Sequence, residues 1–388
     1  MSEEHDPWRP AWEDDPTPEA PAPPWLTPSR ARRLTSRGPN WQALIGPLAA
    51  AEDALSRLDA SVEAASEPVR EGLVARLAFA EAAGWLAAAA GRAWIHPRDL
   101  ALAEAGLLGG FAAAALAGRG TAALPATAGL FGGTGRANRL LQAEADHLPD
   151  GTTLLQGLAL ARALRRLATL ASWDPLASLE AATTMLQALE GETATPLQLR
   201  PAPFATWRRE ILVAPRSGGE PTLLAAAGAA ANWMASEILD GCDPNPAQAL
   251  LFAAAVVRRR KRLRAIPLPF WAMPPGGRPA VLPFGDPAVW FAAFLGRVAA
   301  AATEGAAELR RLRDAEVTVA RLTTSGRQDL LPFAAAAALR APAVTARGLA
   351  SQLGMTPQGA LLLLKRLQAA GILREVTGRR SFRAYAIN

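Results

Sequence analysis

Apolar residues recur every three to four positions through most of the chain between residues 41 and 322, which is the pattern of amphipathic helices. In WQALIGPLAAAEDALSRLDASVE, at 41–63, the apolar positions form a single stripe. Similar patterns predict further helices from residue 97 onwards and over 67–90, 152–173, 221–239, 246–264 and 288–322. No convincing alternation of apolar and polar residues precedes the C-terminus. The body is therefore predicted to be all-helical.

Two proline-rich stretches interrupt this pattern. The first 40 residues are acidic and rich in proline, which favours a disordered tail and does not resemble a secretory signal. Residues 265–287 are dense in proline and glycine and are predicted to form a loop. The chain is therefore divided into a tail at 1–40, a helical body at 41–320 and a C-terminal unit at 321–388.

The C-terminal unit carries the signals of a winged helix-turn-helix. DLLPFAAAAALRAP predicts a first helix, and VTARGLASQLG a second with Thr345 as its N-cap. MTPQGALLLLKRLQAAG predicts a third helix that begins after Thr356 and Pro357 and ends at Gly371. ILREVTGRRSFRAYAI then predicts two short strands around TGRRS. This order of elements, with a two-stranded wing, indicates a mainly α protein with a C-terminal winged helix-turn-helix.

Positive charge is concentrated in this unit. From Leu309 to the end there are 13 basic and 4 acidic residues, a net charge of +9, whereas the whole chain carries +6. Such a surplus favours a polyanionic partner, and double-stranded DNA is the predicted one. The predicted DNA-binding residues fall into two groups. Thr356, Gln358, Lys365 and Arg366 lie on or near the helix that would enter the major groove, and Arg379, Arg380 and Arg383 lie on the wing, where phosphates would pass.

Protein docking is the alternative role for this unit, because winged helices also serve as dimerisation or docking modules. GALLLLKRL is apolar where a sequence-reading helix usually carries polar side chains. Leu361 and Leu362 cannot both belong to the core, so at least one of them is expected to face DNA or a protein partner. If the partner is DNA, this apolar character predicts modest sequence specificity.

Cysteine and hydropathy narrow the class of protein. The single cysteine, Cys242, excludes a disulfide within the chain and any cysteine-based metal cage, and it fits a reducing cytoplasm. No window of the sequence resembles a membrane span. Only Lys261 and Lys365 among the 41 basic residues are lysine, a bias that is typical of a high-GC genome. A cytoplasmic protein without metal or cofactor is predicted.

Two family resemblances add to these predictions. TARGLASQLGMTPQGALLLLKRLQAAGILREVTGRRSFRAYAI resembles the winged-helix tail of many Fic-domain proteins, including GIL.E.TGR and a closing R.Y. The whole chain more closely resembles an alphaproteobacterial family in which a helical domain of unknown function precedes a helix-turn-helix. PLAAAEDALSRLDASV at 47–62 and RLAFAEAAGWLAAAAGRAWIHPRDLALAEAG after it carry this second resemblance. Together they imply a distantly Fic-like body.

The Fic resemblance directs attention to a glycine-rich loop at 130–141, LFGGTGRANRLL. Active Fic proteins carry HPFxxGNGRxxR, in which the histidine is a general base and the glycine-rich turn binds nucleotide phosphates. Gly135, Arg136 and Arg139 fit the end of that pattern, but an apolar residue takes the place of the histidine and Thr134 that of the asparagine. The loop also lacks the GK[ST] of a P-loop. It is predicted to connect two helices.

A second loop fits the order of Fic elements better but also lacks the base. In NWMASEILDGCDPNPAQALLFAAAVV, at 232–257, Ile238 stands where the histidine is expected, and Pro246 and Ala249 take the two arginine positions. The three histidines, His5, His96 and His147, lie in neither loop. The resemblance therefore implies a catalytically inactive body and not an enzyme.

One further basic run leaves its role open. RRRKRLR at 258–264 lies at the end of a predicted helix, where its cations would complement the helix dipole. The alternative is that the run contacts phosphate or nucleic acid.

The leading hypothesis is a non-enzymatic DNA-binding protein, a transcriptional regulator or accessory factor, whose body forms a homodimer or senses a ligand or partner. An interaction scaffold is the second hypothesis. A nucleotidyl-transferring enzyme is the third, and the missing base counts against it.

Overall fold

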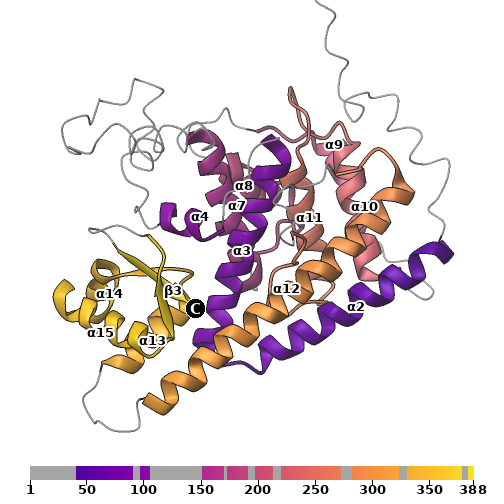
Figure 1. Cartoon of the computed structure of the whole chain (residues 1–388). Helices are drawn as coiled ribbons and strands as arrows, with labels where there is room; N and C mark the ends of the chain where they lie inside the picture. The colour runs from indigo at the N-terminus through magenta and orange to yellow at the C-terminus, as the bar shows by residue number, and fades with distance from the viewer. Residues whose placement is uncertain are drawn as a thin grey trace, which may run out of the picture.

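Helices make up most of the chain (Figure 1), as the spacing of apolar residues predicts. The computed structural model describes residues 41–90, 97–104, 151–169, 173–190, 197–212, 220–271, 282–322, 330–377 and 383–388. The predicted tail, the loop at 130–141, the three histidines, Arg379 and Arg380 lie outside the described residues. The helices of the body are α2 (Trp41–Glu63), α3 (Glu67–Ala90), α4 (Pro97–Glu104), α7 (Gly151–Thr169), α8 (Leu179–Glu190), α9 (Pro201–Leu212), α10 (Thr222–Met234), α11 (Pro246–Arg259) and α12 (Pro287–Leu322).

The long helices α2 and α12 pack side by side and run in the same direction (Figure 1). Arg313 on α12 donates a hydrogen bond to the carbonyl of Ser61 at 2.6 Å, and Ser66, just beyond α2, donates to Glu316 at 2.5 Å. The stripe predicted on α2 faces this contact, since Leu55 and Leu58 are fully buried. The helix α3 packs against α12 and also against α7, so it lies at the centre of the body.

Four elements of the body differ from the sequence predictions. The helix predicted over 246–264 ends at Arg259, and the residues that follow it are non-helical. The helix predicted over 221–239 ends at Met234, because Ile238 and Leu239 are extended and pair with residues 198–200, just before α9. The helices α8 and α9 were not predicted. Prolines at 201 and 203 both lie in the first turn of α9, where the N–H groups that proline lacks would have no partner within the helix.

Two buried acidic side chains hold the irregular segment after α11 in place. Asp59 on α2 accepts hydrogen bonds from the backbone N–H groups of Arg264 and Ala265, at 3.1 to 3.2 Å. Glu81 on α3 accepts from the N–H groups of Phe270, at 2.7 Å, and Trp271, at 2.9 Å. A non-helical strap, residues 260–271, is therefore held between α2 and α3 by side chains that satisfy its backbone.

The C-terminal domain consists of α13 (Leu331–Arg340), β1 (Val344–Thr345), α14 (Ala346–Leu353), α15 (Pro357–Ala369), β2 (Leu373–Glu375) and β3 (Ala384–Ile387). Its strands form an antiparallel sheet in the order β1-β3-β2, with Val344 opposite Tyr385 and Leu373 opposite Ile387. The order of elements confirms the predicted winged helix-turn-helix. The two-residue strand β1 was not predicted, because it is too short to show any alternation.

The helix α13 attaches this domain to the body (Figure 1). Arg76 on α3 donates hydrogen bonds to the carbonyls of Leu339, at 2.8 Å, and Ala341, at 2.9 Å, which are free acceptors at the end of α13. Its guanidinium also lies 3.2 Å from Glu308 on α12. Burial lowers the pKa of Arg76 to about 10 despite this carboxylate, so the side chain stays charged at neutral pH.

Close backbone contact reinforces this attachment. Gly72 on α3 lies directly against the carbonyl of Leu339, with no room for a β-carbon between them. Arg340 forms an ion pair with Glu71 beside this contact, at 2.6 Å. The main packing partners of α15 are α13, α14 and β2, so it lies on the side of the domain away from the body.

Within the described residues, no helix has the length and apolar character needed to cross a membrane.

Candidate nucleic-acid interface

Two threonine caps and one glycine shape the helix-turn-helix. The hydroxyl of Thr345 accepts a hydrogen bond from the N–H of Gly348 at the start of α14, and that of Thr356 accepts from Gly359 at the start of α15. Gly354 ends α14 with a φ of 64°, a left-handed conformation that glycine adopts without strain. The N-caps predicted from the sequence are therefore confirmed.

The helix α15 has one buried face and one polar face. Ala360, Leu363, Leu364 and Leu367 are buried against the rest of the domain. The exposed residues include Gln358, Leu362, Lys365 and Arg366 on one side, with Pro357 at the start of the helix and Gln368 and Ala369 at its end. Leu361 is partly buried against the core, whereas Leu362 exposes 60% of its surface, so the prediction that both cannot be core residues is confirmed.

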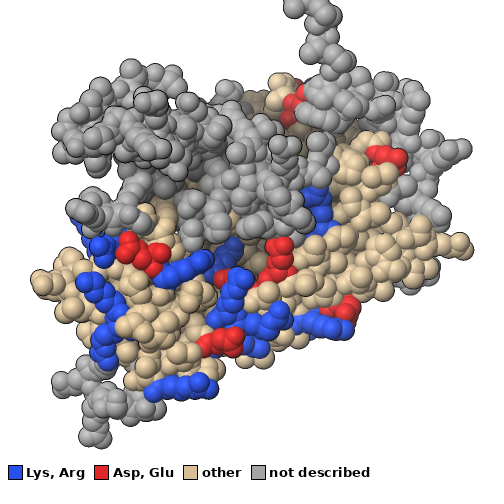
Figure 2. All heavy atoms as spheres, viewed as in Figure 1, with Lys and Arg blue, Asp and Glu red and all other residues tan. Residues whose placement is uncertain are grey.

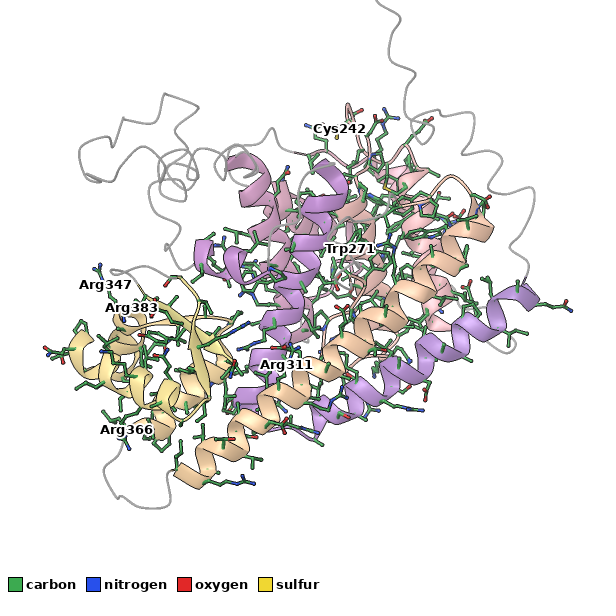
Figure 3. All side chains as sticks on the ribbon, viewed as in Figure 1. Cys242, Trp271, Arg311, Arg347, Arg366 and Arg383 are labelled. Carbon is green, nitrogen blue, oxygen red and sulfur yellow. The ribbon has the colours of Figure 1, made fainter. Side chains whose placement is uncertain are left out.

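Several basic side chains of the domain are exposed, and some of them have no acidic partner among the residues that the structure describes. The side chains of Arg347, Lys365 and Arg374 form no ion pair with any residue that the structure describes. Arg383, just before β3, lies 3.6 Å from Glu375 and is partly exposed. Figure 3 shows Arg347 and Arg383 at one end of the domain and Arg366 projecting from the other. Basic atoms outnumber acidic ones over the domain in Figure 2.

Residues 331–387 match the family of HTH DNA-binding domains. The chain has a C-terminal helix-turn-helix DNA-binding domain. The matched segment contains eight basic residues but a single acidic one, Glu375, so its net charge exceeds that of the whole chain. Comparison of the chain with curated proteins gives no match.

Arg347 and Arg374 were missed as candidate DNA-binding residues, although the sequence holds a signal for each. Arg347 is the second residue after the Thr345 cap, in the first turn of α14, where a helix turns its free N–H groups towards solvent. Arg374 is the exposed residue between two less exposed neighbours on β2, the alternation expected of a half-buried strand. Both side chains lie on elements that adjoin α15.

The basic run at 258–264 is used inside the body. Arg262 forms an ion pair with Glu52 at 2.6 Å and donates to the hydroxyl of Ser56, which ties the strap to α2. Arg258 donates to the carbonyls of Leu263 and Arg264. The remaining arginines of the run are also engaged: Arg259 with Asp174, Arg260 with the carbonyl of Glu220, and Arg264 with Glu63. The run therefore connects elements of the body.

The second loop compared with the Fic motif forms a turn between α10 and α11. Ile238 is buried, and Pro246 begins α11 directly after the Asn245 N-cap. The buried side chain of Gln248 accepts hydrogen bonds from the indole N–H of Trp233, at 3.2 Å, and the N–H of Asn245, at 3.1 Å. The described part of the chain contains no histidine and no cluster of three or more His, Cys, Asp or Glu residues that could hold a metal ion.

Proposed function

We propose that the protein binds duplex DNA through the outer face of α15 and acts as a transcriptional regulator or as an accessory factor of one. The observation that carries this proposal is the face itself. Gln358, Lys365 and Arg366 lie exposed on it, on a helix-turn-helix domain whose net charge is strongly positive. A polyanion is attracted by that charge, and an exposed helix of this width fits the major groove of B-DNA.

The way in which the domain is attached supports the proposal. The body contacts the domain mainly through α13, and α15 packs on α13, α14 and β2. The described part of the body therefore leaves the outer face of α15 open to a partner as large as a DNA duplex. In this arrangement Lys365 and Arg366, with Arg347 and Arg374 on neighbouring elements, are placed to contact phosphates, and Gln358 near the start of α15 is placed to reach a base edge.

Removing the charges of Lys365 and Arg366 should weaken binding to all DNA sequences alike. For the double variant Lys365→Gln and Arg366→Gln, the plot of log affinity against log salt should become shallower by about two units, because each lost phosphate contact releases about one counterion fewer. Fluorescence anisotropy with a labelled duplex at several salt concentrations measures this slope.

A matched control removes two charges elsewhere. Arg57 and Arg264 have side chains more than 70% exposed on the body, so Arg57→Gln with Arg264→Gln changes the net charge equally. This control should bind DNA nearly as the wild type does. Equal loss in both double variants would indicate general charge attraction and contradict a specific role for α15. If no variant and no wild-type chain binds DNA at low salt, the scaffold hypothesis is favoured.

We also propose that the helical body is not an enzyme and has a regulatory role, as a homodimer or as a binding site for an effector. The buried Ile238 at the position of the Fic base supports the absence of catalysis, whereas kinship with Fic domains rests on the sequence resemblance alone. Incubation of the protein with ATP and magnesium should leave its intact mass unchanged. A mass increase equal to one AMP, lost when residues 238–246 are altered, would contradict this part of the proposal.

A further inference from the structure

Leu362 lies at the centre of the polar face of α15. Gln358 precedes it by four positions and Lys365 follows it by three, so all three side chains neighbour one another along one stripe of the helix. Leu362 is 60% exposed, whereas the buried residues of α15 lie on the opposite side. An apolar side chain is therefore flanked by an amide and an ammonium group on the face that the proposed function assigns to DNA.

The folding of the domain gives no reason for this leucine. The core contacts of α15 come from Ala360, Leu363, Leu364 and Leu367, and the body docks through α13. A stable protein interface needs a larger apolar patch than a single leucine. The centre of such an interface is also depleted of charged residues, whereas Lys365 adjoins Leu362. The charge of the face fits a polyanion instead.

The major groove of DNA offers one apolar group at its base edges, the C5-methyl of thymine. It is displayed beside hydrogen-bonding atoms, and the adenine paired with thymine presents the N6 and N7 atoms that an amide side chain can recognise. Three neighbouring side chains of α15 complement these groups. The amide of Gln358 can bind a base edge, the apolar Leu362 can contact a methyl group, and the cation of Lys365 can bind a phosphate.

We propose that Leu362 contacts the methyl group of thymine, so that α15 selects duplex sites containing A·T pairs at the position that this side chain reaches. The inference rests on the proposed function and names the class of DNA that the same face prefers. Leu362 acts in it as a residue that determines specificity, and Lys365 and Arg366 supply binding that does not depend on sequence.

Replacement of thymine by deoxyuridine tests this directly, because it removes the methyl group and retains base pairing. The preferred duplex of the full chain is first selected from a random pool, and each thymine of the selected site is then replaced in turn. At one or two positions the wild type should lose about fourfold in affinity, the amount expected for one buried methyl group. The Leu362→Ala variant should bind the thymine and deoxyuridine duplexes equally.

Gln358→Ala provides the matched control, since it alters the same stripe. This variant should lose preference for adenine but keep the sensitivity to deoxyuridine. The inference is overturned if the selected pool shows no preference, if the wild type binds thymine and deoxyuridine duplexes equally at every position, or if Leu362→Ala retains the wild-type sensitivity. It is also overturned if Leu362→Ala alters the oligomeric state and leaves DNA affinity unchanged. A chain that binds no duplex at all contradicts the proposed function as well, so the two failures are distinguishable.

Discussion

Replacement of Glu81 with Gln should stabilise the protein at pH 8 to 9 and flatten the dependence of its stability on pH between about 5 and 8. Glu81 is only 4% exposed, and burial raises the pKa of its carboxyl from 4.5 to about 8. The N–H groups of Phe270 and Trp271 and the charge of Arg297 act in the opposite direction without overcoming burial. Glu304 adds to the upward shift.

The sign of the effect follows from the difference in proton affinity between the two states. The unfolded chain releases the proton near pH 4.5, whereas the folded chain keeps it until about pH 8. Folding therefore takes up a proton in this window, and the free energy of unfolding falls as the pH rises through it, by up to about 5 kcal/mol. The Gln side chain does not ionise, and its amide oxygen can still accept both N–H groups.

Urea denaturation of the wild type and of Glu81→Gln at several pH values measures this difference. Glu180→Gln, which alters an exposed carboxylate on α8, should retain the wild-type dependence on pH. Parallel curves for the wild type and Glu81→Gln would show that Glu81 has the same charge state in the folded and unfolded chain, which contradicts the prediction.

Gly72→Ala should destabilise the contact between the body and the DNA-binding domain. An ideal β-carbon at position 72 would lie 1.9 Å from the carbonyl oxygen of Leu339, so α3 and α13 would have to move apart. The hydrogen bonds from Arg76 to the end of α13 would then lengthen or break. Overpacking of this kind costs about 1–3 kcal/mol, more than the gain of up to about 1 kcal/mol that alanine gives over glycine in a helix.

Gly296→Ala on α12 is the matched control, because no atom lies within 4 Å of the added β-carbon. It should leave the free energy of unfolding unchanged or raise it slightly. If both variants are equally stable in urea denaturation, the close packing of α3 on α13 is not a constraint on the protein.

Local signals in the sequence predicted much of the fold. The threonine caps, Pro357 and the left-handed Gly354 are chemical features of single turns, so the helices of the C-terminal domain could be located from them. Apolar periodicity likewise located α2, α3 and α12. The helix α9 was missed because its prolines stand in its first turn, and β1 because two residues carry no pattern.

The candidate interface was predicted only in part, since charge alone does not show which cations are exposed without a partner. The run at 258–264 has the denser positive charge, yet its arginines meet Glu52, Asp174 and the backbone carbonyl of Glu220, which come from distant parts of the sequence. Arg374 and Arg347 have no such partners among the described residues. Tertiary contacts decide this difference, and no local pattern contains them. The positions predicted for Arg379 and Arg380 stay predictions.

Amide hydrogen exchange of the full chain, with and without a saturating DNA duplex at low salt, tests most directly whether the outer face of α15 binds DNA. We expect protection on DNA binding to be concentrated in residues 345–375, which include α14, α15 and β2, with little change in α2 or in the run at 258–264. Protection confined to the run at 258–264 or to other parts of the body, or no change anywhere in the chain, would contradict the proposed function.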